Sequence, residues 1–576
     1  MVRAGDIVSV TDSTGEIHSF WDVRMGDGGR SISFGPCTSS FRNGDPHRDA
    51  MSADGDRSIL RSTRVSAGDL EALAARVSTE GQREGIAVSA PAVDEVVGSV
   101  PACAPADVER AVARARTARE HWTSQSPERR GEVLRRFGEL VLDHRAVCAD
   151  VVQLETGKVR RHALEEVASI PNETGYYAKR TPEWLASEPR ASTLPGVTTT
   201  RVSREPVGVV GVISPWNYPL ALSVTDAIPA LAAGCPVVLK PDERTPFAAL
   251  LLADLFEQAG GPPDALQVVT GEGDAVGPAL IDAVDYVAFT GGIETGRIVA
   301  ERAGRNLVDC SLELGGKNPF LVLEDADLEA AVRGAVQSAF TNAGQLCLGC
   351  ERFLIEESVY DAFLAAFLEA TDALELGFAF EYVHDVGSLI DGAHLASVET
   401  AVDRAVQDGG TVETGGESRP DVGPFFFEPT VLGGLELEHP IAREEIFGPV
   451  VSVHPVPDVE TAIAAANDTD GGLHASVWSR DRERGLAVAE AIDCGSVAVN
   501  DAYVASYGAM DAPMGGVGSS GIGRRHGREG FDRYLESRSI TRSRVGPIAD
   551  PPGVPQRLSA RGLAFLARLR SRFPGG

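Results

Sequence analysis

The spacing of hydrophobic residues changes early in the chain. Residues 1–60 are rich in Gly, Ser, Asp and Arg and show no sustained apolar period, which predicts a disordered or loosely attached segment. Met51 offers an alternative start, so a further hypothesis is that residues 1–50 are not translated. Beyond this segment apolar residues recur at helical spacing, and residues 106–118 and 128–156 are predicted to be helical.

Further along the chain, short apolar runs alternate with helical segments. Residues 207–213, 237–240, 266–270 and 284–289 each end at turn or glycine-rich residues, and a helical pattern at 246–259 separates two of them. Such alternation favours a parallel sheet covered by helices. It predicts a doubly wound α/β domain.

A second set of alternating elements occupies the later half of the chain. Strands are predicted at 320–323, 352–356 and 496–500, and helices at 328–340 and 359–374. They predict a second α/β domain, so the expected fold class is α/β with two such domains.

Composition narrows the function classes. The 576-residue chain has a formal net charge of −30, which argues against nucleic acid or an anionic membrane as a partner. No apolar run could span a bilayer and no secretory signal opens the sequence, so we expect a cytoplasmic protein. Only four of the 53 basic residues are lysine, which together with the acidity is typical either of a GC-rich gene or of adaptation to high salt.

The eight cysteines are scattered through the chain, which favours reduced thiols over a disulfide framework. Cys347 and Cys350 form a CxxC pair. No second CxxC and no nearby pair of histidines accompanies it in the sequence, so we expect no metal site.

The segment TNAGQLCLGCER at 341–352 carries the clearest chemical signal. Its Cys347 follows a flexible turn, and a thiol that attacks a carbonyl needs a base and a donor to the oxyanion. Glu313, between two leucines, has the partial desolvation that suits a base, and Asn217, in the rigid PWNYP loop, can donate from its amide. Each also has an ordinary structural interpretation: a buried small hydrophobic residue for the cysteine, an ion pair with Lys317 or an arginine for the glutamate, and a turn cap for the asparagine.

Three further segments suit a dinucleotide. FTGGIETG (289–296) follows a predicted strand, and its glycines could open a helix whose N–H groups meet a phosphate. Lys240 ends another strand and can bond ribose hydroxyls, whereas Glu243 would repel a 2′-phosphate and favours NAD over NADP. In REEIFGPV (443–450) an acid can bind a ribose and a phenylalanine can pack on a flat ring. Each signal is weak alone.

In order, PWNYP, KPDERTP, FTGGIETG, LELGGKNP, GQLC and EEIFGPV resemble the signature of the NAD(P)-dependent aldehyde dehydrogenase superfamily, from about residue 106 to 544. The resemblance implies that Cys347 is the nucleophile, Glu313 the general base, and Asn217, with the Cys347 backbone N–H, the oxyanion hole. It implies oxidation of an aldehyde to an acid through a thiohemiacetal and a thioester, with NAD expected before NADP. The residues implied to hold the cofactor are Ser214, Trp216, Lys240, Glu243, Gly273, Gly291, Gly292, Gly296, Glu445 and Phe447.

The resemblance also implies an aldehyde dehydrogenase-like fold with two Rossmann-like domains and a small oligomerisation β-extension, assembled as a homodimer or homotetramer. The expected parts are an NAD-binding domain (61–186 and 207–312), a catalytic domain (313–513), an oligomerisation segment (187–206 and 514–546) and a C-terminal tail with one short helix (547–576).

Local motifs (NAGQLC, DAPMGG and GRRHGREG) are most similar to the succinate-semialdehyde dehydrogenase-like branch. Studied members of that branch bind the distal carboxylate with two arginines, and those positions hold Thr225 and Thr341 here. Arg525 stands where many members have a glutamate near the proton path. Because of the similar motifs, we expect succinate semialdehyde as the substrate. Because the two arginines are absent, a broad-specificity aliphatic or aromatic aldehyde dehydrogenase is the alternative.

Two other classes stay open at this point. A catalytically silent binding protein on the same fold would be expected to lack the cysteine, the glutamate or the asparagine, and the sequence has all three. A cysteine hydrolase needs a histidine partner, and none of the 11 histidines lies in a recognisable Cys/His motif.

Overall fold

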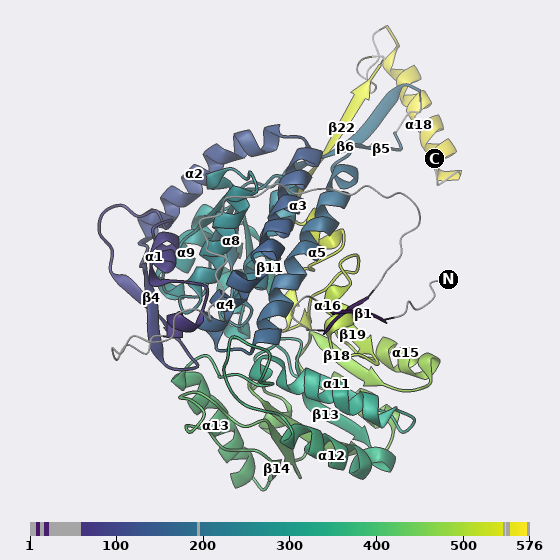
Figure 1. Ribbon diagram of the computed structural model, residues 1–576. Coiled ribbons are helices and arrows are strands. Elements are labelled where there is room, and N and C mark those ends of the chain that lie inside the picture. The colour runs from purple at the N-terminus through teal and green to yellow at the C-terminus, as the bar shows by residue number, and fades with distance from the viewer. Residues whose placement is uncertain are drawn as a thin grey trace. The chain divides into compact units, whose positions relative to one another are not determined.

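Two mainly parallel sheets, each with helices packed on it, carry most of the chain (Figure 1). They are seen in a computed structural model that describes residues 7–11, 17–21, 59–192, 196–544, 546, 548 and 553–572. Both sheets lie in one compact unit, Pro46–Gly576, and the segment Met1–Asp45 forms a unit of its own.

The first sheet has six strands in the order β21-β11-β10-β7-β8-β9. Its inner strands run parallel, and β21 joins β11 antiparallel at one edge. Helices cover the parallel strands, which explains their continuous apolar runs. The strands are β7 (Val210–Ile213), β8 (Val237–Lys240), β9 (Leu266–Val268), β10 (Tyr286–Thr290), β11 (Asp309–Glu313) and β21 (Gly521–Ile522), and the helices beside them are α2 (Pro105–Ser124), α8 (Pro246–Gln258), α9 (Gly273–Ala283) and α10 (Ile293–Asn306).

The second sheet has seven strands in the order β14-β15-β16-β13-β12-β18-β19, and all pairs except β14–β15 are parallel. The two sheets confirm the predicted α/β fold class with two Rossmann-like halves. The strands are β12 (Asn318–Val322), β13 (Cys350–Glu356), β14 (Thr411–Thr414), β15 (Thr430–Gly433), β16 (Val450–Val456), β18 (His474–Trp478) and β19 (Ser496–Val499), with α11 (Leu328–Phe340), α12 (Glu357–Asp372), α13 (Gly392–Gln407), α14 (Val459–Asn467) and α15 (Arg482–Glu490) around them.

The helical run predicted at 128–156 is two helices, α3 (Pro127–Asp143) and α4 (Arg145–Thr156). The break lies at His144, whose backbone (φ −96°, ψ 17°) leaves the helical region. A one-residue break does not interrupt the apolar period, so the sequence pattern could not show it. The long helix α5 (Arg160–Trp184) follows and packs along α3.

A three-stranded sheet of β5 (Glu188–Arg190), β6 (Thr198–Pro206) and β22 (Leu535–Ser543) joins two segments far apart in sequence. In Figure 1 it projects from the helices and sheets around it. It lies within the two segments predicted to form the oligomerisation extension, and most of β22 is exposed. The domain boundaries and the association with a partner stay predictions.

Residues 1–60 need one correction. β1 (Ile7–Thr11) and β2 (Ile17–Trp21) form an antiparallel pair where no regular structure was expected, because the surrounding segment is rich in Gly, Ser, Asp and Arg. Residues 1–6, 12–16 and 22–58 lie outside the described part of the chain. The helix predicted in the tail is α18 (Gln556–Arg572).

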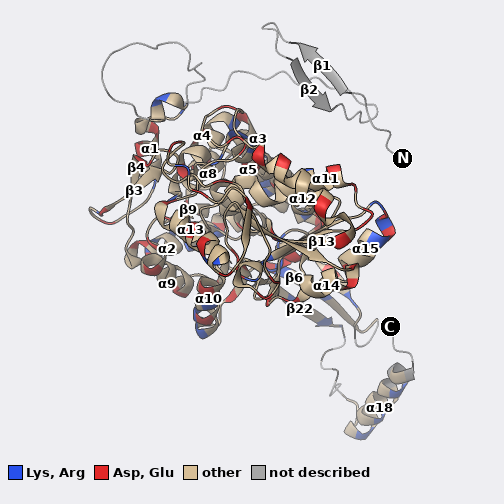
Figure 2. Cartoon of the chain, turned by 90° about the horizontal axis from the view of Figure 1, so that it is seen from below, with Lys and Arg blue, Asp and Glu red and all other residues tan. Residues whose placement is uncertain are grey.

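None of the described helices is both long and apolar enough to cross a membrane. Acidic residues are dispersed over the outer helices with basic residues between them (Figure 2). The remaining elements are η1 (Ile59–Ser62), α1 (Ala67–Ala74), β3 (Gly85–Ala90), β4 (Glu95–Pro101), α6 (Pro219–Val224), α7 (Ala227–Ala233), η2 (Pro263–Ala265), η3 (Thr341–Gly344), η4 (Pro440–Ala442), β17 (Gly471–Gly472), α16 (Val504–Gly508), β20 (Val517–Gly518) and α17 (Glu529–Asp532).

Candidate active site

A left-handed turn at the end of α11 places Cys347. Asn342, Ala343 and Gly344 all have positive φ, of 55°, 54° and 72°. Such a conformation costs an alanine about 1 kcal/mol or more, so the surrounding structure must hold it in place. At Gly344 a side chain could not fit, because a Cβ there would lie 1.9 Å from the carbonyl oxygen of Gly448.

Side-chain amides fix the chain on both sides of the thiol. Asn318 donates from Nδ2 to the carbonyl oxygens of Cys347 (2.8 Å) and Gly349 (2.9 Å). Asn217 donates from Nδ2 to the carbonyl of Gln345 at 3.2 Å, which ties the PWNYP loop to the cysteine loop. No hydrogen bond from the Cys347 amide to another described residue is found, so this N–H remains available to a ligand.

The PWNYP loop rests on a buried ion pair from α5 and the loop before it. Lys158 Nζ lies 2.5 Å from Glu166 Oε1 and donates to the carbonyl of Asn217 at 2.7 Å. Glu166 Oε2 in turn accepts from the amides of Leu220 (3.0 Å) and Ala221 (3.1 Å), which satisfies the first turn of α6. Neither Lys158 nor Glu166 was singled out as a site residue from the sequence. Both hold the asparagine in place.

Glu313 ends β11 and is 5% exposed. Its Oε1 has no hydrogen-bond partner in the described chain and lies 2.9 Å from the position of a Cβ on Gly515. Burial raises the pKa of Glu313 to about 7. The ion pair with Lys317 considered above does not form, because Lys317 Nζ lies 2.6 Å from Glu351 instead.

The three predicted catalytic residues line one cavity. It has a volume of about 270 Å³, and Cys347, Glu313 and Asn217 form part of its wall. Burial raises the pKa of the Cys347 thiol to about 12 although the charge of Arg525 lowers it, so the thiol is protonated at neutral pH in the absence of a ligand. A half-buried thiol, a carboxyl with a pKa near neutrality and an amide donor are groups that suit covalent acyl chemistry.

A larger cleft of about 660 Å³ adjoins this cavity and shares Trp216, Gly291 and Gly292 with it. It lies at the carboxyl ends of β7, β8 and β10, where open α/β sheets bind ligands. Ser214, Lys240, Glu243 and Gly273 also line the cleft, while Glu445 and Phe447 line the smaller cavity.

The residues of the cleft suit a dinucleotide. Gly292 precedes the first turn of α10, whose N–H groups are unpaired by the helix, and a Cβ added there would meet open space. Gly296 is the exception among the predicted residues, since it lines neither cavity. A Cβ at Gly296 would lie 2.5 Å from a methyl carbon of Leu314, so this glycine lets α10 pack closely on the strand end.

Comparisons with known proteins agree with this geometry. The sequence profile of the aldehyde dehydrogenase family matches residues 77–540. The chain belongs to the aldehyde dehydrogenase family. It is 44% identical over 477 residues (83% of this chain and 92% of the relative) to a Mycolicibacterium smegmatis protein named "Putative succinate-semialdehyde dehydrogenase" with NADP(+) as cofactor. It is 36% identical over 455 residues (77% and 92%) to the succinate semialdehyde dehydrogenase of Acinetobacter baylyi.

A solved structure gives the same result for the fold. Betaine aldehyde dehydrogenase from Staphylococcus aureus in complex with NAD+ superposes with a TM-score of 0.77 and 34% identity, over 83% of this chain and 98% of that one. The protein is therefore an NAD(P)-dependent oxidoreductase that acts on an aldehyde group.

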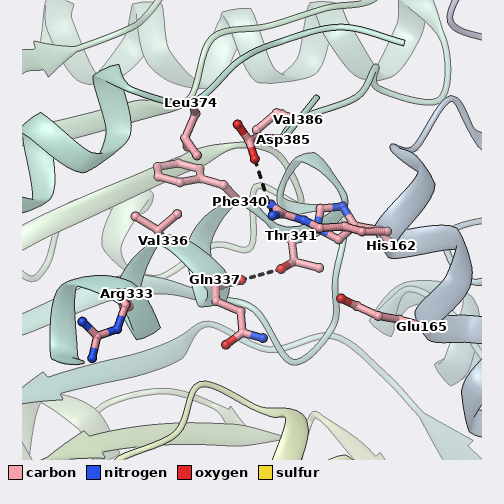
Figure 3. A pocket seen from close by; sticks show the side chains of 11 residues that line it. His162, Glu165, Arg333, Val336, Gln337, Phe340, Thr341, Leu374, Asp385 and Val386 are labelled. Carbon is pink, nitrogen blue, oxygen red and sulfur yellow. Dashed lines mark hydrogen bonds and ion pairs between the residues drawn. The ribbon is translucent and has the colours of Figure 1, made fainter. Parts of the chain in front are cut away.

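Both threonines at the expected arginine positions of this aldehyde dehydrogenase are engaged within the protein. Thr225 donates from its buried hydroxyl to Glu173 at 3.0 Å. Thr341 donates to the carbonyl of Gln337 at 2.7 Å and lines a second pocket of about 270 Å³ (Figure 3). Arg161 also lines that pocket but lies 3.4 Å from Asp385. Neither threonine can supply the charge that a distal carboxylate would meet at an arginine.

Proposed function

We propose that this aldehyde dehydrogenase oxidises succinate semialdehyde to succinate with NAD as the acceptor, through a covalent intermediate on Cys347. The observation that carries the catalytic part is the meeting of Cys347, Glu313 and Asn217, from three distant segments, in one cavity beside the cofactor cleft. The substrate rests on the relatives named as succinate-semialdehyde dehydrogenases.

In the first half-reaction the thiolate of Cys347 attacks the aldehyde carbon. The carbonyl oxygen becomes an oxyanion, and Asn217 Nδ2 and the Cys347 amide are the two donors positioned to receive it. When bound, a nicotinamide cofactor would accept the hydride that leaves the thiohemiacetal carbon, and the thioester would remain on Cys347. The residues that would hold this cofactor are Ser214, Trp216, Lys240, Glu243, Gly273, Gly291, Gly292, Glu445 and Phe447.

In the second half-reaction Glu313 takes a proton from water, and the resulting hydroxide attacks the thioester to release the acid. The carboxyl suits this task because a base whose pKa is near 7 is both ionised and basic at neutral pH. Its Oε1 accepts no hydrogen bond from the described residues and lies next to Gly515. Because glycine has no side chain, a water can approach this oxygen without displacing one.

Glu243 supports NAD over NADP. Its Oε2 lies 3.0 Å from Lys240 Nζ in the cleft. Lys240 is expected to bond the ribose, so the carboxylate of Glu243 lies beside the expected ribose position. A 2′-phosphate there would meet like charge. Arg302 and Arg305 line the same cleft and favour the opposite preference, as does the NADP in the name of the mycobacterial relative. We propose NAD because the carboxylate stands beside the lysine.

The projecting sheet supports assembly with further copies. β22 lies at the edge of its sheet, with β6 on one side only, and most of its residues are exposed. An open strand edge is a template for pairing with another chain. We propose a homodimer or homotetramer built through this sheet.

A screen of aldehydes tests the substrate. With NAD, we expect NADH to form fastest from succinate semialdehyde. With NADP and the same aldehyde, we expect NADPH to form at least about tenfold more slowly, which corresponds to a difference of about 1.4 kcal/mol. The matched comparison is butanal, which has the same carbon chain without the carboxylate. Equal kcat/KM for both aldehydes would contradict succinate semialdehyde and support the broad-specificity alternative, which the two threonines favour. A catalytically silent protein would form no reduced cofactor with any aldehyde.

Replacing the oxyanion donor tests the first half-reaction. We expect Asn217→Ala to lower kcat/KM by about 10²- to 10³-fold, because one donor to the developing charge is lost. Asn318→Asp is an informative comparison, since Asn318 supports the cysteine loop through carbonyl oxygens and does not face the substrate. An Asn217→Ala enzyme with unchanged kcat/KM would remove the asparagine from the oxyanion hole.

A further inference from the structure

One charged residue in the wall of the catalytic cavity has no role in the chemistry above. Arg525 is 4% exposed and lines the cavity together with Cys347 and Glu313. It donates from Nε and Nη2 to the two carboxylate oxygens of Asp226, at 3.1 and 2.6 Å, and from Nη2 to the hydroxyl of Thr290. This two-pronged contact fixes the plane of the guanidinium. Its third nitrogen, Nη1, donates to no described residue.

The buried cluster around Asp226 has an excess of positive charge. Arg533 also donates to Asp226, so two buried guanidinium groups share one carboxylate. Burial raises the pKa of the neighbouring Glu173 well above its usual range, which favours the uncharged acid. Burial and the two arginines lower the pKa of His526 to about 4, which leaves the imidazole uncharged. The cluster therefore carries one unbalanced positive charge beside the reacting groups.

We infer that Arg525 is the cation that stabilises negative charge first on the Cys347 thiolate and then on the Glu313 carboxylate, with Asp226 as its positioning residue. This inference rests on the proposed roles of the cysteine and the glutamate. In the free enzyme the guanidinium opposes the effect of burial on the pKa of the thiol, and so increases the small fraction of thiolate that can react. Once the sulfur is acylated it is uncharged, and the same guanidinium then favours the ionised carboxyl, at the stage when a base is needed.

The pKa shifts of Cys347 and Glu313 agree with an effect of Arg525 on both groups. Burial raises the pKa of Cys347 and of Glu313, and in each case Arg525 is the largest influence that opposes burial. An ionised Glu313 raises the pKa of the thiol, so the two groups compete for one charge. The other titratable and charged groups that act on Arg525, Cys347 or Glu313 are Asp226, Arg533, Arg524, Glu173, Glu445, His526, Tyr218, Tyr507 and Tyr534.

The pH dependence of Cys347 alkylation tests the inference without cofactor or substrate. The rate of modification by iodoacetamide would be followed by mass spectrometry of the peptide that contains Cys347, from pH 6 to pH 10. We expect Arg525→Gln to slow alkylation at a fixed pH by about tenfold, a shift of about one pH unit to higher pH. Arg525→Lys should restore most of the rate. Asp226→Asn should shift the profile to lower pH, because it removes the only anion of the cluster.

The alkylation profiles of Arg525→Gln and Asp226→Asn are expected to shift in opposite directions, whereas damage to the fold would not give opposite shifts. Arg130→Gln is the matched control, since Arg130 is a buried arginine that bonds only main-chain carbonyls in the described structure, and its alkylation profile should not move. Profiles of Arg525→Gln and Asp226→Asn that shift in the same direction, or an Arg525→Gln profile that matches the wild type, would overturn the inference. If Cys347→Ser retains NADH production, the proposed function fails, while the alkylation result still decides the role of Arg525.

Discussion

Cys347→Ser should abolish the formation of NADH from an aldehyde. We expect kcat/KM to fall by at least about 10³-fold, because a serine hydroxyl is a far weaker nucleophile than a thiolate. The substitution changes one buried atom, so the Tm should stay within a few degrees of the wild type. Steady-state NADH absorbance measures the rate, and quenching of tryptophan fluorescence measures NAD binding, which should persist since Trp216 lines the cleft.

Cys350→Ser is the matched control for this loss. Cys350 is buried in β13, and its Sγ contacts the carbonyl of Pro319 at 3.4 Å, away from the catalytic cavity. Its activity should remain within about threefold of the wild type, since serine at a buried site changes packing and hydrogen bonding modestly. Full oxidation by the Cys347→Ser enzyme would remove this residue as the nucleophile. Loss of activity in the Cys350 variant alone would point to a role for the CxxC pair.

Glu313→Gln should separate the two half-reactions. Glutamine keeps the shape of the side chain but cannot accept a proton from water, so the thioester should form and then persist. We expect a burst of about one NADH per subunit followed by a steady-state rate lowered by about 10²- to 10⁴-fold. Stopped-flow absorbance resolves the burst, and mass spectrometry of the quenched protein detects the acyl group on Cys347.

The pH profile of the wild type gives an independent check on the same residue. The pKa of Glu313 is raised to about 7, so the carboxyl is neutral and inactive as a base below that pH. Where hydrolysis limits turnover, kcat should therefore rise with pH through about 7 with the slope of a single proton. Glu313→Gln should lack this rise. A wild-type kcat that is flat between pH 5.5 and 8.5, or a glutamine variant that keeps the rise, would assign the base elsewhere.

Sequence patterns predicted a strand at β7, β8, β9, β10, β12, β13 and β19, where apolar runs end at turns, but not at the parallel strands β11, β15, β16 and β18. The run at 237–240 is β8 to the residue, and 328–340 is α11 to the residue. Boundaries were lost where the apolar period continues across a break, as at His144. β1 and β2 were missed because they lie in a segment rich in Gly, Ser, Asp and Arg.

Some residues of the candidate site could be predicted from the sequence and others could not. Cys347, Glu313 and Asn217 were found because their motifs are local and contiguous in the sequence. Lys158 and Glu166, which support Asn217, were missed as site residues, since their contact with the PWNYP loop joins positions more than fifty residues apart. Gly296 was expected to contact the cofactor because of its motif, but it packs against Leu314.

By itself, the sequence determined the α/β class and the family and singled out the three candidate reactive residues, because these depend on periodicity and on short motifs. Only the tertiary structure decided which charges act on those residues. It paired Lys317 with Glu351, left Glu313 without an ion pair, and set Arg525 and Arg533 on Asp226 beside it. The physical reason is that a pKa depends on burial and on charges within a few ångströms, and such neighbours come from segments hundreds of residues apart.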